Sequence, residues 1–564
     1  MAIGSAVHRR KRPLVEKRPA PRRRRVLSGP LALPWGVVSV PAMRTHVPLV
    51  CLALVGTLGL TAPCLAASSS STDSKAHSAK KHKAKAKPSP AKTAAATKGK
   101  KGNKEKRKHS PVAASEIAAK VAPASKPAVP AAPDPAVASL ERFGLSIQRA
   151  SLANGLKVVM NPDHSAPTVA VSVTYGVGSS SEVEGRTGFA HLFEHMMFQG
   201  SKHAKKGEHF TLISDRGGSL NGTTNSDRTN YYEVLPASEL ELALWLESDR
   251  MRWLAVTPEN FENQRAVVQE EFRMRIQNQA YVPGTIRLGE LVYKGYAPYS
   301  HPTIGSMVDL DAAKFEWVKD FHDQHYAADN AVLTIAGDFE PDQAMALVEK
   351  YFAAAERKNV PQLVFPPPPE TPSTGRATVE DTNARTPGFM FGFLIPPSRT
   401  PEHYALEMAT LILTGGESSR LYKQLVHDRA VAERISAWTD DHRGPDQFSV
   451  LGVLTDKGKL SDVEAAVDAA LAQLRKTPPT VAELDKAKRQ LRSSFVFGLQ
   501  TNNGRAIQLG EFESHWGDAR LLSHELSQYL AVTPEAVQKA AARYLTPERR
   551  SLVEVLPAAK GGKP

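Results

Sequence analysis

The chain has 564 residues, enough for about two to four domains, and 41% of its residues are hydrophobic. Its net charge of +14 is uneven, because residues 1–110 hold 25 of the 72 Lys and Arg but only three of the 58 Asp and Glu. The basic character therefore belongs to the N-terminal segment, and the rest of the chain is mildly acidic. A core that binds nucleic acid is not supported.

The apolar stretch VPLVCLALVGTLGLTAPCLA, residues 47–66, has the layout of a secretory signal. Small residues at its end predict cleavage near Ala66 or Ala67. Cleavage predicts a periplasmic or secreted protein, whereas a retained stretch of about 20 apolar residues can anchor the chain in a membrane. Residues 1–67 are thus expected to be a basic extension and signal, and Met43 is an alternative start that gives a conventional signal by itself.

The two cysteines, Cys51 and Cys64, both lie in this apolar stretch. After cleavage the protein contains no cysteine and can form no disulfide. Any metal ion must then be held by histidine and carboxylate side chains.

Residues 68–137 consist mainly of Ala, Lys, Pro and Ser, with few large apolar side chains. Such a segment cannot bury enough apolar surface to offset the entropy lost on ordering, so we expect a disordered linker. The linker is either a solvated tether or a segment whose positive charge contacts an anionic surface of the cell envelope.

Folded structure is expected from residue 138 on. Strands are predicted on both sides of the Asn154-Gly155 turn and in the β-branched stretch 168–179. The pattern also predicts helices at 187–200 and 263–279 and a closing strand at 331–339.

The proline-rich stretch FPPPPETPSTG, residues 365–375, predicts a linker, because it can form neither a helix nor a central strand. After it the order of strand, turn and helix recurs, with a strand at 387–397 and helices at 402–416 and 461–476. We therefore expect an α+β fold of two similar half-domains, 138–364 and 376–560, each a mainly antiparallel sheet packed with helices.

The motif HLFEH at residues 191–195 lies in the first of these predicted helices. His191 and His195 are four residues apart, so they share one helix face and can present two imidazoles to one ion, with Glu194 beside them. Two such nitrogens and one carboxylate leave a fourth position open, the arrangement of a catalytic zinc site. As a bare motif, H-x-x-E-H is expected by chance in roughly a few of every hundred chains of this length.

The H-x-x-E-H arrangement resembles the inverted zinc motif of the inverzincins. The wider sequence resembles the pitrilysin family, particularly its bacterial branch similar to mitochondrial processing peptidase. The resemblance covers about residues 146–555 and is carried by GVGSSSEVEGRTGFAHLFEHMMFQGSKH, GGSLNGTTNSDRTNYYEVLP, RAVVQEEFRMR, HPTIGSMVDL, FHDQHYAADNAVLTIAGDF and GGESSRLYKQL.

The resemblance implies one zinc ion per chain, held by His191, His195 and a glutamate about 75 residues downstream. Aligning RAVVQEE with the family's helix makes this glutamate Glu271, with Glu270 as the alternative. These neighbours differ by about 100° around a helix, so only one of them can face the histidines. The resemblance also implies that Glu194 is the general base, which takes a proton from the attacking water and passes it to the leaving amine.

Two substrate-binding residues follow from the same resemblance. The segment around Asn221 resembles the family's exposed edge strand, to which a peptide adds as a further strand. Asn221 would then contact the substrate backbone, and Phe198 would line the pocket beside the metal. The alternatives are a turn asparagine and a core phenylalanine.

The chain departs from the family's pattern at three positions. Relatives often carry a glutamate seven residues before the third zinc ligand, where this chain has Gln264, whose amide can still form a supporting hydrogen bond. After SRLYKQL many relatives place an arginine and, seven residues later, a tyrosine that grips the substrate. Here Val426 and Glu433 occupy those positions, and neither side chain can replace the arginine or the tyrosine. The chain thus resembles the zinc-bearing subunit of a heterodimer whose partner supplies the arginine and tyrosine.

Taken together, the residues and the resemblance predict a zinc-dependent endopeptidase or oligopeptidase that hydrolyses unfolded or short peptides. The first alternative is a non-catalytic scaffold of the same family. The second is a protein that binds the envelope surface through its basic tail.

Overall fold

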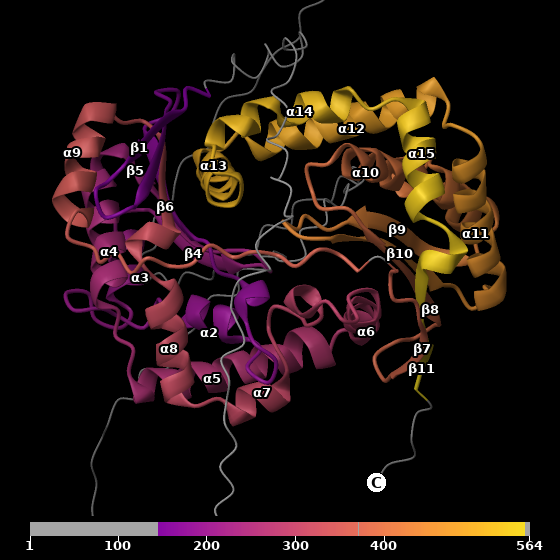
Figure 1. Ribbon diagram of the computed structural model, residues 1–564, viewed down its shortest axis with the longest axis horizontal. Helices are drawn as coiled ribbons and strands as arrows, with labels where there is room; N and C mark the ends of the chain where they lie inside the picture. The colour runs from indigo at the N-terminus through magenta and orange to yellow at the C-terminus, as the bar shows by residue number, and fades with distance from the viewer. Residues whose placement is uncertain (1–144, 370, 559–564) are drawn as a thin grey trace, which may run out of the picture. The chain divides into compact units, whose positions relative to one another are not determined.

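The computed structural model describes residues 145–369 and 371–558, which form two β-sheets packed with helices (Figure 1). The first sheet has six strands in the order β1-β2-β6-β3-β5-β4, and the second has five in the order β7-β11-β8-β10-β9. The prediction of an α+β fold with two similar half-domains is confirmed. The expected signal and linker, within residues 1–137, lie outside the described residues.

The bounds of the elements are as follows. The first sheet contains β1 (Gln148–Ser151), β2 (Lys157–Pro162), β3 (Thr168–Tyr175), β4 (Ser219–Thr224), β5 (Thr229–Pro236) and β6 (Ala331–Gly337). The second contains β7 (Arg376–Asp381), β8 (Gly388–Ile395), β9 (Ala432–Thr439), β10 (Asp446–Leu454) and β11 (Arg550–Pro557). The helices before the proline-rich stretch are α2 (Phe189–Met196), α3 (Glu208–Ser214), α4 (Leu240–Trp253), α5 (Pro258–Phe272), α6 (Val282–Val292), α7 (Met307–Ala312), α8 (Phe315–His325) and α9 (Pro341–Phe352). Those after it are α10 (Pro401–Thr414), α11 (Leu460–Lys476), α12 (Val481–Gly498), α13 (Asn502–Trp516), α14 (Leu522–Leu530) and α15 (Pro534–Tyr544).

The two sheets repeat one topology. In the first, β2 pairs parallel with β6, and the pairs β6–β3, β3–β5 and β5–β4 are antiparallel. In the second, β7 pairs parallel with β11, and the pairs β11–β8, β8–β10 and β10–β9 are antiparallel. Strand β1 is an addition to the first sheet. The equivalent strands β4 and β9 each end their sheet, so within the described residues their outer edges have no neighbouring strand.

Each half contributes a helix to the other half's sheet. Helix α13 packs on β3 and β6 of the first sheet, and α6 packs on β8 and β11 of the second (Figure 1). Glycines permit both contacts: a Cβ on Gly510 of α13 would lie 2.8 Å from the Thr174 hydroxyl, and one on Gly392 of β8 would lie 2.6 Å from Val292 of α6. The strands of the two sheets are thus separated in sequence by the proline-rich stretch, but each sheet is covered by a helix from the other side of that stretch.

Three elements differ from the predicted bounds by more than two residues at one end. Strand β3 ends at Tyr175 rather than near 179, because a 3-10 turn at Ser179–Ser181 follows. Helix α2 spans Phe189–Met196 and is shorter than the expected 187–200. The helix expected at 263–279 begins earlier, at Pro258 after the N-cap Thr257, and continues as a π-helical segment to Gln277.

Candidate metal centre

The start of helix α2 is fixed by contacts with a distant loop. Gly188 has φ +91°, and a Cβ there would lie 2.6 Å from the carbonyl oxygen of Ile304, so only glycine fits. The carboxylate of Glu182 accepts hydrogen bonds from the backbone N–H groups of Gly188 (2.8 Å) and Ala190 (2.7 Å). An acceptor at this position satisfies the free N–H groups of the first turn and so sets where the helix begins.

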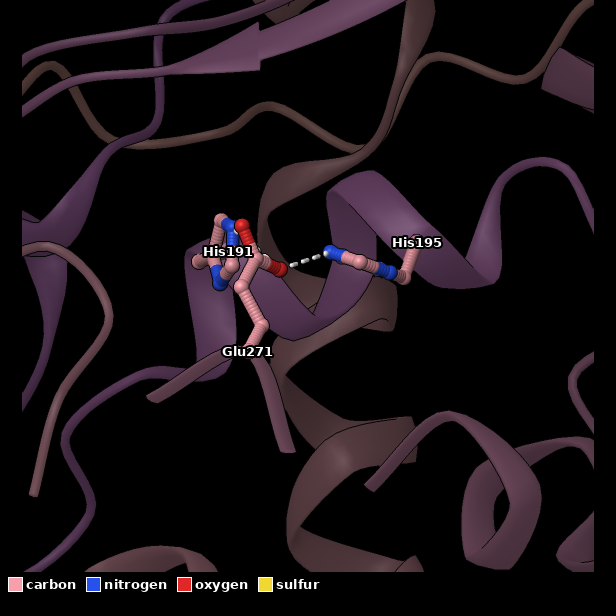
Figure 2. Close-up of side chains that lie close together, drawn as sticks. All are labelled: His191, His195 and Glu271. Atoms are coloured by element: carbon pink, nitrogen blue, oxygen red, sulfur yellow. Dashed lines mark ion pairs between the residues drawn. The ribbon is translucent and has the colours of Figure 1, made fainter. Parts of the chain in front are cut away.

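His191, Glu271 and His195 converge from α2 and α5 (Figure 2). The Glu271 Oε2 atom lies 3.1 Å from His195 Nε2 and 3.7 Å from His191 Nε2, and the two rings are 4.9 Å apart between centroids. Ligand atoms bound to a tetrahedral zinc at about 2.0–2.2 Å are about 3.4 Å from one another. The three side chains therefore present the donor types and the spacing that a zinc ion requires.

The two neighbouring glutamates on α5 have different surroundings. The Glu271 side chain is 12% exposed, and its second oxygen pairs with Arg275 Nε at 2.9 Å. The Glu270 side chain is 59% exposed and pairs with Arg273 at 2.9 Å. Of the two, the structure brings Glu271 to the histidines.

The charge states of Glu271 and His191 also suit a metal. Burial raises the pKa of the Glu271 carboxyl, but the hydrogen bond from His195 and the charges of His191, His195 and Arg275 outweigh it and hold the pKa at about 2. Burial lowers the pKa of His191. An ionised carboxylate and a neutral imidazole are the forms that bind a divalent cation.

Glu194 lies on α2 against the edge strand β4. The Thr224 hydroxyl at the end of β4 donates a hydrogen bond of 2.6 Å to Glu194 Oε2. A Cβ on Gly222 would lie 3.0 Å from Glu194 Cγ, so glycine allows the strand to cross the helix closely. Sequence reasoning missed Thr224, since nothing in the residue pattern indicates that its hydroxyl reaches the helix.

The two proposed substrate-binding residues lie beside this crossing. Asn221 is exposed on β4, opposite Tyr232 of β5. Phe198 is half-buried, with its ring centroid 5.0 Å from Phe210 and 5.8 Å from Tyr231. A Cβ on Gly222 would also lie 3.3 Å from the Phe198 ring, so Phe198 lies beside Glu194. Asn221, one residue before Gly222 on the strand, points to the opposite face of β4. The roles of both residues remain predictions.

The residues at the three departures lie on α5 of the first half and in the second half. Gln264 is buried on α5, where its amide donates to Asn263 at 2.7 Å. Val426, in the π-helical turn Tyr422–Asp428, packs against the core of the second half. Glu433 is exposed near the start of the edge strand β9.

Two further clusters in the described residues combine histidine and carboxylate ligand atoms within 4.8 Å. In one, formed by His209, Glu233 and Glu247, the buried Arg250 guanidinium pairs with Glu247 and supplies the positive charge. The other consists of Asp440, His442 and Asp446.

Asp446 of this last cluster lies between two imidazoles, 2.7 Å from His403 Nε2 and 3.3 Å from His442 Nδ1. Burial lowers the pKa of both histidines, but the hydrogen bond and charge of Asp446 raise each to about 9. In both clusters the carboxylate charge is thus balanced by side-chain cations.

Comparison with known proteins agrees with this geometry. The family profile described as Insulinase (Peptidase family M16) matches residues 157–286, and the one described as Peptidase M16 inactive domain matches residues 313–491. All three converging side chains fall in the first match. No helix in the described ranges has the length and apolar character to cross a bilayer.

Individual proteins are similar over most of the described chain. The zinc protease PqqE of Helicobacter pylori is 28% identical over 358 residues, which cover 63% of this chain and 80% of that protein. The crystal structure of a protease from H. pylori matches with a TM-score of 0.68 at 26% identity, over 73% of this chain and all of that one. The periplasmic protease PqqL of Escherichia coli matches with a TM-score of 0.60 at 18% identity, over 73% of this chain but 47% of its own length. Since profiles of the M16 family match both halves and proteins named as zinc proteases match in sequence, the chain belongs to the M16, or pitrilysin, family, which is of the metallopeptidase type.

Proposed function

We propose that the chain is a zinc-dependent endopeptidase or oligopeptidase. The observation that carries the proposal is the convergence of His191, His195 and Glu271, with Glu194 on the same helix as the histidines. Relatives named as zinc proteases support the choice of metal. A zinc ion held by these three residues would supply Lewis acidity toward water and the scissile carbonyl.

The chain's own residues would carry the proton and hold the substrate. Glu194 accepts a proton from the attacking water and passes it to the nitrogen of the leaving amine, so one carboxylate serves as base and then as acid. The Thr224 hydroxyl bonds one Glu194 oxygen and leaves the other for the water.

The substrate would bind as an added strand along the open edge of β4. An extended peptide there exchanges main-chain hydrogen bonds with the strand, which favours unfolded or short peptides over folded proteins. Asn221 would contact the peptide backbone, and Phe198 would face a side chain next to the scissile bond.

The experiment that tests this function compares Glu194→Gln with Glu184→Gln, a matched change at an exposed glutamate. We expect Glu194→Gln to abolish peptide cleavage while zinc content, measured by mass spectrometry, stays at one ion per chain. Glu184→Gln should leave both unchanged. Peptide cleavage by Glu194→Gln at the wild-type rate would reject the assignment.

We further propose that full activity needs a partner subunit. Val426 and Glu433 stand where many relatives are expected to carry the arginine and tyrosine that grip the substrate. The match to 47% of PqqL is consistent with one chain being half of a complete enzyme. The test is to assay the purified chain alone and with a second M16-type chain, and full activity of the chain alone would exclude a required partner.

We also propose a periplasmic or secreted location with the basic linker as a separate element. N-terminal sequencing of the mature protein would locate the start and any cleavage near Ala66 or Ala67. Deleting residues 68–136 should preserve peptide cleavage. If the linker contacts the envelope, the deletion should also release the protein from the membrane fraction.

A further inference from the structure

A buried carboxylate in the turn between β4 and β5 lies outside the proposed chemistry. Asp227 is 2% exposed. Its Oδ1 accepts hydrogen bonds from the Ser180 hydroxyl (3.2 Å) and the Tyr299 hydroxyl (2.9 Å), and its Oδ2 accepts one from the backbone N–H of Arg443 (2.8 Å). A buried carboxylate is costly unless such donors satisfy it, so these three groups fix its position.

One of these donors belongs to the second half-domain. Arg443 lies in the loop between β9 and β10, the hairpin equivalent to β4–β5. The next residue, Gly444, donates its N–H to the Tyr299 hydroxyl at 2.9 Å, and the Tyr299 ring stacks on His442 with centroids 4.1 Å apart. Asp227 and Tyr299 therefore join the two equivalent hairpins, one from each half.

The β4–β5 turn that carries Asp227 is held by further hydrogen bonds. Asn225 Oδ1 accepts from the backbone N–H groups of Asp227 and Arg228, both at 2.8 Å. The backbone N–H of Ser180 donates to the Ser226 carbonyl at 2.8 Å, which ties the turn to the segment before α2. A shift of Asp227 must therefore move the neighbouring end of β4.

The last residue of β4 is Thr224, three residues before Asp227. The Thr224 hydroxyl donates a hydrogen bond of 2.6 Å to Glu194 Oε2. Hydrogen bonds and the short backbone segment from Thr224 to Asp227 thus connect the loop of the second half to the carboxylate proposed as the base.

We infer that Thr224 and Asp227 are positioning residues for the reaction. Thr224 orients the Glu194 carboxylate, and Asp227 fixes the hairpin that carries Thr224 against the second half-domain. The half without metal residues would then set the geometry of the base in the other half. The role of Thr224 in turnover rests on the proposed peptidase function, whereas the joining of the hairpins does not.

The first part of the test separates the hydroxyl from the shape of the side chain. Thr224→Val keeps the shape and removes the donor, and we expect kcat to fall about tenfold or more, since a hydrogen bond to a charged group is lost. KM should change by less than about twofold and zinc content should not change, because neither the strand edge nor the three ligands are altered. Thr224→Ser restores the donor and should recover most of kcat, whereas equal losses of kcat in Val and Ser would overturn the role of Thr224.

The second part uses hydrogen–deuterium exchange on the full chain and needs no activity. Asp227→Asn keeps the size but places an amide NH2 group against at least one of the three donors. We expect faster exchange in both 219–236 and 440–446, while Asp215→Asn, an exposed matched change on the same half, leaves both segments as in wild type. Unchanged exchange in 440–446 would overturn the joining of the hairpins. A wild-type chain that binds zinc but cleaves no peptide would reject the proposed function, and the exchange result would still decide the role of Asp227.

Discussion

Replacing Glu271 by glutamine tests the coordination sphere most directly, because its neighbour Glu270 provides a control one residue away. Glu271 Oε2 lies 3.1 and 3.7 Å from the two imidazole nitrogens, whereas Glu270 is 59% exposed and pairs with Arg273. Loss of an outer-shell partner of a metal ligand already costs about 10–100-fold in affinity. Loss of an anionic ligand itself should therefore weaken zinc binding by about 100-fold or more, equivalent to about 2.7 kcal/mol.

The assay is a competition titration of metal-depleted chain against a chromophoric zinc chelator at fixed pH and ionic strength. Glu271→Gln should raise the zinc Kd by about 100-fold or more. Glu270→Gln should keep the Kd within about twofold of wild type, since the exposed Glu270 side chain contributes little to zinc binding. Equal affinities for Glu271→Gln and wild type would refute the assignment of the third ligand. A loss confined to Glu270→Gln would move the ligand to that residue.

Three further outcomes are expected. At a free zinc concentration of 100 times Kd, zinc binding should increase the free energy of unfolding of the metal-depleted chain by about 2.7 kcal/mol and so raise its Tm. In a thermal scan, His195→Ala should remove this increase in Tm. The pKa of His403 is raised from 6.5 to about 9, so its stabilising charge is fully present below pH 6.5 and is lost as pH rises through 9. Between pH 6.5 and 9, urea unfolding should show that the free energy of unfolding falls by up to about 3 kcal/mol, and that it falls less in His403→Gln. An equal fall in that variant would contradict the role of His403. Gly510→Ala should destabilise the chain by about 1–3 kcal/mol, because its Cβ would meet the Thr174 and Thr334 hydroxyls, whereas Gly289→Ala on α6 meets nothing within 4 Å and should stabilise it. Equal urea midpoints for the two alanine variants would contradict this packing.

The sequence was most informative where one local rule applied. The i, i+4 spacing of His191 and His195 predicted their shared helix face, because helix geometry alone determines it. Glu271 could be chosen over Glu270 only through the family resemblance, since periodicity shows that neighbours diverge but not which one faces the histidines.

Contacts between the two halves could not be read from the residue pattern. Asp227 and Arg443 are 216 positions apart, and their hydrogen bond depends on how two hairpins meet. The apolar face of α6 indicates burial, but periodicity does not reveal which sheet covers it. Helix α13 buries Arg505 and Glu513, so its sequence has no apolar face that would indicate burial. Residues such as Thr224 and Asp227, which act through these contacts, therefore have no local signal.

The exchange of α6 and α13 has a consequence for cutting the chain. A protease that nicks the exposed proline-rich stretch breaks one peptide bond but leaves each fragment holding the other's sheet through its borrowed helix. The fragments should comigrate on gel filtration and separate only in denaturant. Either fragment made alone would lack the helix that covers its sheet, so the two pieces need to be produced together to become soluble.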